Sequence, residues 1–286
     1  MISIIIPTLN EEKYLPRLLK SIKNQDYQDY EIIIADAGST DKTIEIAKKY
    51  NCKIVPGGSP AVGRNNGAKA AKGEYLLFLD ADVVLEKNFL KSLLQEFNNS
   101  NIDIATSYIV PLSNKKIDFI LHNTVNVYFR ATQKIYPHAP GFCILVKKDV
   151  HNAVNGFDEE IKLAEDHDYV RRAKKYGKFK VVHFPKIFVS TRRLDTDGRI
   201  NIAVKYLLCE MHRIIIGEVK TNIFNYQFGH YDKKRKQVKI PEYILQKIEK
   251  TIIQLFKKNK ILSEIEDKLS KIEPKIKIKI NKIKKF

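Results

Sequence analysis

Two carboxylates close an apolar run in the stretch Gly73-Glu-Tyr-Leu-Leu-Phe-Leu-Asp80-Ala81-Asp82. Residues 75–79 have the composition of a buried strand, and both aspartates follow it directly. In open α/β sheets, ligands bind outside the carboxyl ends of the strands. A hard divalent cation takes oxygen ligands, which it commonly shares between carboxylates and substrate phosphates. Asp80 and Asp82 therefore predict a site for a metal and a diphosphate, although aspartate is also common in turns.

The elements that position this pair are strands alternating with helices. Residues 3–6 and 31–35 are short apolar runs, and a helical pattern follows each of them, at 14–22 and 44–50. This alternation predicts an α/β fold with a doubly wound, mostly parallel central sheet flanked by helices. Asp36 ends the second run, which places it at the same crevice. A helix cap at Ser39, Thr40 or Asp41 would not account for Asp36.

Residues 57–73 are rich in small side chains, which favour a helix packed closely on the sheet. Arg64 lies near the start of this helix, where its planar guanidinium is suited to bind a phosphate. The alternative is that Arg64 is an ordinary solvated side chain.

The ordered set of motifs resembles family 2 glycosyltransferases, which have the nucleotide-sugar-binding fold called GT-A. The resemblance covers roughly residues 1–193. Its motifs are Pro7-Thr8-Leu9-Asn10-Glu11, Asp36-x-Gly38-Ser39-Thr40-Asp41, Arg64-Asn65-x-Gly67, Asp80-Ala81-Asp82, Gly141-Phe142, Asn155-Gly156-Phe157-Asp158-Glu159 and Glu165-Asp166-x-Asp168-Tyr169-x-x-Arg172.

The resemblance implies a role for each motif. Asp36 would hold the nucleobase, since an ionised carboxylate accepts hydrogen bonds from an imide or amide. Asp82 would be the main ligand of Mg²⁺ or Mn²⁺, with Asp80 against the ribose or the waters of the metal. The cation would offset the charge of the leaving nucleoside diphosphate. The remaining residues expected in the nucleotide-sugar site are Thr8, Asn10, Glu11 and Arg64.

In such enzymes a carboxylate takes the proton of the acceptor hydroxyl, and the resemblance assigns this role to Asp166. Glu165 and Asp168 are the alternatives. Asp166 also stands where an N-cap would open a helix with Tyr169 and Val170 inside. Both roles are compatible, because a helix N-terminus favours a charged carboxylate.

Two departures from the family narrow the subtype. Processive synthases carry a Gln-x-x-Arg-Trp motif, whereas this chain contains no Trp and has Ser190-Thr191-Arg192-Arg193-Leu194 at the matching place. Asp82 is followed by Val83-Val84 and not by the Leu-Gln of dolichyl-phosphate mannose synthases. A processive polymerase is thus disfavoured, and the polyprenyl-phosphate class stays as an alternative. Arg192 and Arg193 are expected to reach the diphosphate from a loop, or else to be a solvated pair.

Composition bounds the remaining possibilities. A chain of 286 residues can bury one large core. Cys52, Cys143 and Cys209 show no metal-binding spacing, and Met1 leads straight into the first strand without room for a signal peptide. These features predict a cytoplasmic protein. No uninterrupted apolar run is long enough to span a membrane, and residues 200–217 predict an amphipathic helix with Ile202, Leu207, Met211 and 214–216 available for packing.

The chain changes character at Lys233, which suggests a catalytic domain over 1–232 and an extension over 233–286. The extension has 18 Lys and Arg against 6 Asp and Glu, so it supplies +12 of the net charge of +18. Ile244, Ile248, Ile252 and Phe256 repeat at helical spacing. This pattern predicts either contact with an anionic membrane surface, as at the inner face of a cell membrane, or an intramolecular hairpin.

The sequence therefore predicts a non-processive, inverting, metal-assisted glycosyltransferase. Its donor would be a nucleoside-diphosphate sugar, with UDP as the first guess, and its acceptor a glycan, a lipid-linked molecule or a small molecule. A non-catalytic nucleotide-sugar-binding module is the alternative. Nucleic acid is not expected as a partner, since the extension lacks stacking aromatics. A dinucleotide-dependent oxidoreductase is excluded because no Gly-x-Gly-x-x-Gly follows the first strand.

Overall fold

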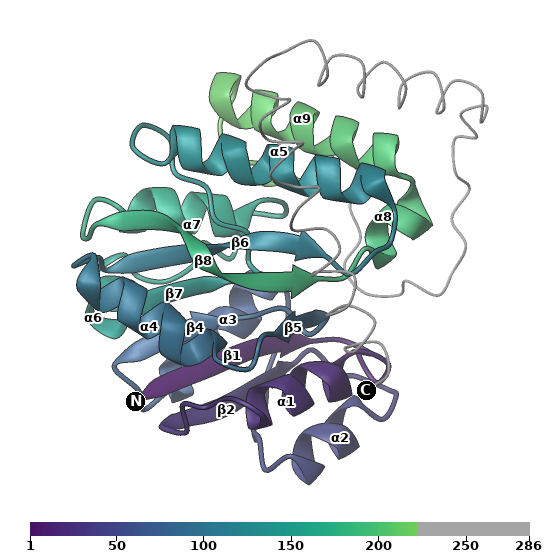
Figure 1. Ribbon diagram of the computed structural model, residues 1–286, viewed down its shortest axis with the longest axis vertical. Coiled ribbons are helices and arrows are strands. Elements are labelled where there is room, and N and C mark those ends of the chain that lie inside the picture. Colours follow the sequence, from purple (N-terminus) through teal and green to yellow (C-terminus); the bar gives the residue numbers. More distant parts are fainter. Residues whose placement is uncertain (222–286) are drawn as a thin grey trace.

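The computed structural model describes residues 1–221, and a mixed sheet of eight strands runs through this part of the chain (Figure 1). The strand order is β3-β2-β1-β4-β7-β6-β8-β5. Parallel pairing joins β1 (Ile2–Thr8), β2 (Tyr30–Asp36), β3 (Lys53–Pro56) and β4 (Tyr75–Phe78). The predicted α/β sheet flanked by helices is confirmed.

The second half of the sheet is mixed. It contains β5 (Val83–Leu85), β6 (Ile104–Pro111), β7 (Ile144–Lys147) and β8 (Phe179–Val189). Strand β7 is antiparallel to both β4 and β6, and β5 is antiparallel to β8, whereas β6 and β8 are parallel. In the order of the sheet, antiparallel pairing therefore begins next to β4, the strand that Asp80 and Asp82 follow.

Helices cover both faces of the sheet, as the alternation of strands and helices requires. They are α1 (Leu15–Lys23), α2 (Thr43–Lys49), α3 (Pro60–Ala70), α4 (Phe89–Asn99), α5 (Lys116–Thr132), α6 (Lys148–Ala153), α7 (Glu165–Ala173), α8 (Arg192–Asp197) and α9 (Arg199–Ile215).

Strand β1 contributes side chains to two separate cores, because successive side chains of a strand point to opposite faces of the sheet. Ile4 and Ile6 of β1 pack in one core with Leu15, Leu18 and Leu19 of α1. Ile5 packs in the other core, to which α3 and α7 also contribute. The residues of β1 and β4 are apolar at nearly every position because both of their faces are covered.

Helix α3 lies unusually close to β1. A Cβ atom at Gly67 would come into overlap with the side chain of Ile5, so only glycine fits there. Ser59 caps this helix by accepting a hydrogen bond from the Val62 amide. The close approach brings Arg64, one turn into α3, to the carboxyl ends of β1 and β4.

The predicted helix over residues 200–217 is present as α9, but its packing was predicted wrongly. Ile202 is buried, whereas Leu207, Met211 and residues 214–216 are exposed. The buried side of α9 is instead formed by Ile202, Cys209 and Arg213. No helix in the described part of the chain is long and apolar enough to cross a membrane. The extension from Lys233, and the domain boundary proposed there, lie outside the described residues.

Candidate active site

Asp36 organises the loop that follows β2. Its Oδ2 accepts hydrogen bonds from the amides of Gly38 (3.0 Å) and Ser39 (2.8 Å). Its Oδ1 accepts the hydroxyl of Thr8 at 2.8 Å, so the ends of β1 and β2 are joined. Asp36 and Thr8 thus lie together at the carboxyl edge of the parallel strands, where the sequence predicted them.

Asn10 also joins the loop after β1 to the loop after β2. Its Oδ1 accepts the amide of Thr40 at 2.9 Å, and its own amide donates to the hydroxyl of Ser39 at 2.8 Å. Asn10 has φ of 56°, in the left-handed region that asparagine tolerates better than most residues. These contacts give Asn10 a structural role in shaping the loop beside Asp36.

Arg64 is buried between the two chemical pairs. Its Nη2 lies 2.9 Å from Asp80 Oδ1, and its Nη1 lies 2.7 Å from Glu165 Oε1. A Cβ atom at residue 141 would overlap the guanidinium, which explains the glycine of the Gly141-Phe142 motif. Arg64 therefore joins the Asp80 pair to the Glu165 pair, a contact that the sequence did not predict.

Asp166 lies in the first turn of α7 and is held by backbone amides. Its Oδ2 accepts the amide of Gly141 at 2.6 Å, and its Oδ1 accepts the amide of His167 at 2.8 Å. The helix begins at Glu165 after Ala164, which has a left-handed φ of 64°, so Asp166 is not the N-cap residue that the sequence predicted. Tyr169 and Val170 are buried, in agreement with the predicted helix face.

Burial dominates the electrostatics of both carboxylates of this pair. It raises the pKa of Asp166, and the charge of Arg64 and the two amide hydrogen bonds oppose it. Burial likewise raises the pKa of Glu165, and the neighbouring Asp166 raises it further. A buried carboxylate with a raised pKa is a stronger base than an exposed one.

Arg192, at the start of α8, connects the Asp82 side of the site to the loop after β1. Its guanidinium binds both oxygens of Glu11, at 2.7 and 2.8 Å, and its Nε lies 2.8 Å from Asp82 Oδ2. Burial raises the pKa of Glu11 to about 7, and the contact with Arg192 opposes this shift. Burial also raises the pKa of Asp82, while Arg192 and Arg193 lower it.

The donor set at Asp80 and Asp82 fits a hard cation. Both groups are carboxylates, and the ion pairs with Arg64 and Arg192 use Oδ1 of Asp80 and Oδ2 of Asp82. Within residues 1–221, no group of three or more His, Cys, Asp and Glu side chains could hold a metal ion. A cation here would therefore need further oxygen ligands, as Mg²⁺ bound by one or two carboxylates takes from substrate phosphates and water.

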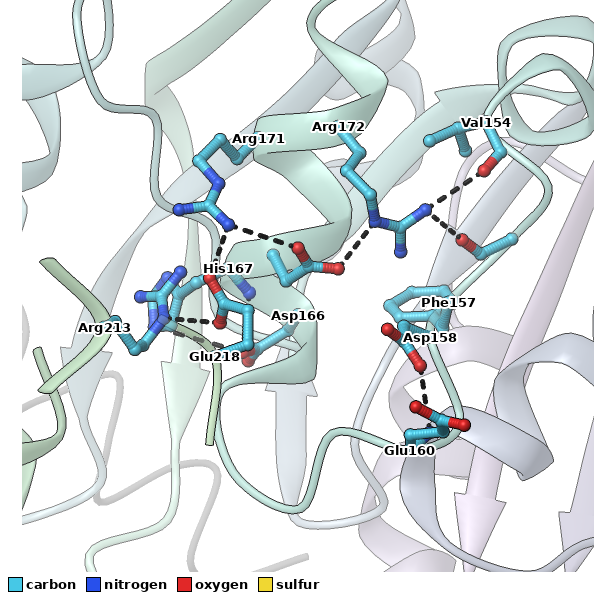
Figure 2. Close-up of polar contacts among 12 residues, drawn as sticks. Val154, Phe157, Asp158, Glu160, Asp166, His167, Arg171, Arg172, Arg213 and Glu218 are labelled. Carbon is cyan, nitrogen blue, oxygen red and sulfur yellow. Dashed lines mark hydrogen bonds and ion pairs between the residues drawn. The ribbon is translucent and has the colours of Figure 1, made fainter. Parts of the chain in front are cut away.

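Helix α7 is anchored on two sides (Figure 2). On one side, Arg172 donates to the carbonyls of Val154 (3.0 Å) and Gly156 (2.9 Å), and its Nε lies 2.6 Å from Asp168. On the other side, Arg171 binds Glu218, which lies just beyond α9. Asp168, an alternative base, is thus an ion-pair partner of the two arginines.

Three residues near these groups carried no signal that assigned them a role. The amide of Gly141 binds Asp166, yet a backbone donor cannot be recognised from a residue type. The ring of Tyr14 lies 4.4 Å from the Arg192 guanidinium. His167 is held neutral beside Asp166, because burial lowers its pKa to about 3. In the sequence, His167 is marked only by its position directly after the Glu165-Asp166 pair.

Comparison with known proteins shows which family and which fold this chain is similar to. The model of the family "Glycosyl transferase family 2" matches residues 3–153. The poly(ribitol-phosphate) β-N-acetylglucosaminyltransferase TarS of Staphylococcus aureus is 29% identical over 191 residues, which cover 60% of this chain and 32% of that protein. The chain thus spans about a third of the length of this curated relative.

Solved structures share the fold. Residues 1–349 of S. aureus TarS in complex with UDP-GlcNAc superpose with a TM-score of 0.55 at 22% identity, over 81% of this chain and 77% of that one. The mannosyltransferase PcManGT from Pyrobaculum calidifontis, in complex with GDP-Man and Mn²⁺, gives a TM-score of 0.61 at 19% identity, over 75% and 64% of the two chains. At these identities the likeness establishes the GT-A type of fold.

Proposed function

The chain belongs to glycosyl transferase family 2, and on that premise we propose that it is a non-processive, inverting glycosyltransferase. It would move a sugar from a nucleoside diphosphate to an acceptor hydroxyl or phosphate on a glycan, a lipid-linked molecule or a small molecule. The observation that carries the proposal is Arg64, whose guanidinium joins Asp80 to the Glu165-Asp166 pair. This contact links the side that we expect to hold the diphosphate to the pair that contains the expected base.

In the proposed reaction, Asp166 accepts the proton of the acceptor hydroxyl as that oxygen attacks the anomeric carbon. The bond from the anomeric carbon to the diphosphate oxygen breaks, and the nucleoside diphosphate leaves from the opposite face, which inverts the configuration. The amides of Gly141 and His167 hold the Asp166 carboxylate in one orientation. Positioned bases of this kind typically contribute about 10²–10⁴-fold to the rate.

Asp82 and Asp80 would hold a Mg²⁺ or Mn²⁺ ion. When bound, the ion would supply positive charge at the leaving diphosphate. Arg192 and Arg193 supply positive charge from the chain itself, and both act on Asp82. Arg192 is already paired with Glu11 and Asp82, so an arriving diphosphate would compete with these carboxylates for its guanidinium. Asp36, Thr8 and Asn10 shape the loop assigned to the nucleoside.

The donor is identified with a thermal-shift panel of UDP-, GDP- and dTDP-sugars, each with Mn²⁺ and with EDTA. A ligand that binds the native state alone raises its stability by RT ln(1 + [L]/Kd). We expect a UDP-sugar to give the largest shift, and EDTA to reduce it.

The substitution Asp82→Asn tests the metal assignment, because it should weaken binding of the nucleoside diphosphate in Mn²⁺ but not in EDTA. Equal affinity of the variant and the wild type at saturating Mn²⁺ would remove Asp82 from the site. A wild-type protein that binds a donor but transfers its sugar to no acceptor would support the non-catalytic binding module.

A further inference from the structure

A cavity of about 200 Å³ lies beside Asp82, on the side of α1. Its walls come from the start of α1, from the segment that begins at Asp82, from Leu112, and from α8 with the two residues before it. Arg17 of α1 and Tyr14, which caps this helix, line the cavity together with Ser190 and Arg192. Liquid water occupies about 30 Å³ per molecule, so the cavity has room for a group much larger than one water.

The charged side chains that line this cavity are paired, with one exception. Asp82 is bound by Arg192 at 2.8 Å. Asp195 is bound by Arg199 at 2.8 Å and by Lys115 at 3.1 Å. Arg17 is the exception, since its Nε and Nη2 are buried and have no hydrogen-bond partner among the described residues. The cavity therefore holds one guanidinium with two unsatisfied nitrogens, Nε and Nη2 of Arg17.

Unsatisfied buried donors cost free energy, so a charged group in this state points to a missing ligand. A guanidinium offers a planar set of donors that matches the oxygens of a phosphate. The hydroxyl of Ser190, which accepts the amide of Arg192 at 3.2 Å, keeps its own proton available as a further donor. A neutral ligand would leave the charge of Arg17 unbalanced.

We propose that Arg17 binds a phosphate group of a substrate in this cavity, next to Asp82. The inference rests on the proposed function in one respect: the phosphate would belong either to the donor or to the acceptor of that reaction. Binding of the phosphate itself needs no turnover, so it can be tested independently of catalysis.

The experiment compares the wild type with Arg17→Met, which keeps the length and packing of the side chain but removes its charge and donors. The matched control is Lys23→Met, an exposed cation on the same helix. Calorimetric titration with pyrophosphate in EDTA, which prevents binding through a metal, should show at least a tenfold loss of affinity for Arg17→Met and no change for the control. Thermal melting should show that Arg17→Met is as stable as the wild type or more so, because the guanidinium it removes has no partner.

Titration with UDP and uridine then identifies the substrate. If the phosphate belongs to the donor, Arg17→Met weakens UDP binding and leaves uridine binding unchanged. If it belongs to the acceptor, UDP affinity stays unchanged and KM rises for a phosphate-bearing acceptor. The inference is overturned if pyrophosphate binds the wild type and Arg17→Met equally, or binds neither. It is also overturned if Arg17→Met melts at a lower temperature without a change in binding, since Arg17 would then act in packing alone.

Discussion

At the scale of single residues, Asp166 has the surroundings of a base that is positioned before the substrate arrives. Two amides fix its carboxylate, and burial raises its pKa. The substitution Asp166→Asn keeps the shape of the side chain but removes its capacity to take a proton. We expect kcat to fall by at least about a hundredfold while donor affinity changes little, which steady-state kinetics and calorimetry can measure.

The control for this substitution is Glu165→Gln. Glu165 is engaged by Arg64 at 2.7 Å, so its loss should disturb the position of Arg64 and affect donor binding as well as kcat. If Asp166→Asn turns over like the wild type, the base is another carboxylate, and Glu165 and Asp168 become the candidates.

Glu11 gives a prediction about pH. Burial raises its pKa from an ordinary value to about 7 in the folded protein, although Arg192 opposes the shift. The folded state then holds this proton more tightly than the unfolded state does. Tighter proton binding at Glu11 stabilises the folded state. This stabilisation is complete below about pH 4, near the pKa of an unfolded glutamate, and is lost as the pH rises through about 7.

The substitution Glu11→Gln isolates this contribution, because glutamine stays neutral at every pH. The melting temperature of Glu11→Gln, relative to the wild type, should therefore rise between about pH 4 and pH 7 and then level off. If the melting temperature of Glu11→Gln relative to the wild type instead falls over this pH range, the ion pair with Arg192 outweighs the cost of burying the Glu11 charge.

At the scale of elements, the stability of the site depends on how α7 is fastened to the end of α9. Glu218 binds Arg171 of α7 and Arg213 of α9, and the Arg213 side chain is fully buried (Figure 2). Lys162, shortly before α7, donates its amide to the Val219 carbonyl at 2.8 Å. The segment after α9 thus holds the loop and helix that carry the Glu165-Asp166 pair.

The substitution Glu218→Gln should therefore destabilise the protein by about 2 kcal/mol, since it leaves a buried arginine with fewer anionic partners. Thermal melting should show a decrease of several degrees. Glu160→Gln is the matched control, because Glu160 pairs with Lys220 at 2.6 Å on the surface, with 74% and 55% of the two side chains exposed. Its effect should stay within about 0.5 kcal/mol. Equal losses in both variants would show that Glu218 does not fasten α7.

At the scale of the whole molecule, the parts that could be predicted from the sequence are those with local patterns. The runs at 3–6 and 31–35 lie within strands, and the run at 75–79 forms a strand up to Phe78, as their apolar residues predict. The contacts between distant residues had no such pattern. Arg64 and Glu165 are 101 positions apart, and Glu11 and Arg192 are 181 apart, so only the folded chain brings each pair together. Strands β5 and β7, with three and four residues, are too short to show a clear period.

The outer surface of α9 has an apolar character that a folded domain rarely exposes. Leu207, Ile214 and Ile215 are 61%, 64% and 74% exposed. Large exposed apolar patches commonly mark contact with a protein or a membrane. In the sequence, the Lys-rich segment 233–286 contributes +12 of the net charge, which favours attraction to anionic headgroups. Together these features support a peripheral contact with an anionic membrane.

If this contact forms, the protein should cosediment with anionic vesicles at low salt and be released at high salt, because salt screens the attraction of lysines to headgroups. Deleting residues 233–286 should abolish vesicle binding and leave nucleotide-sugar binding nearly unchanged. The double substitution Leu207→Ser, Ile215→Ser should weaken vesicle binding with the extension still present, since it removes apolar area that would enter the interface.

Neutral vesicles serve as the control and should retain little protein. Full-length protein that stays in the supernatant with anionic vesicles at low salt would refute membrane contact, and deletion of the extension should then lower the melting temperature instead.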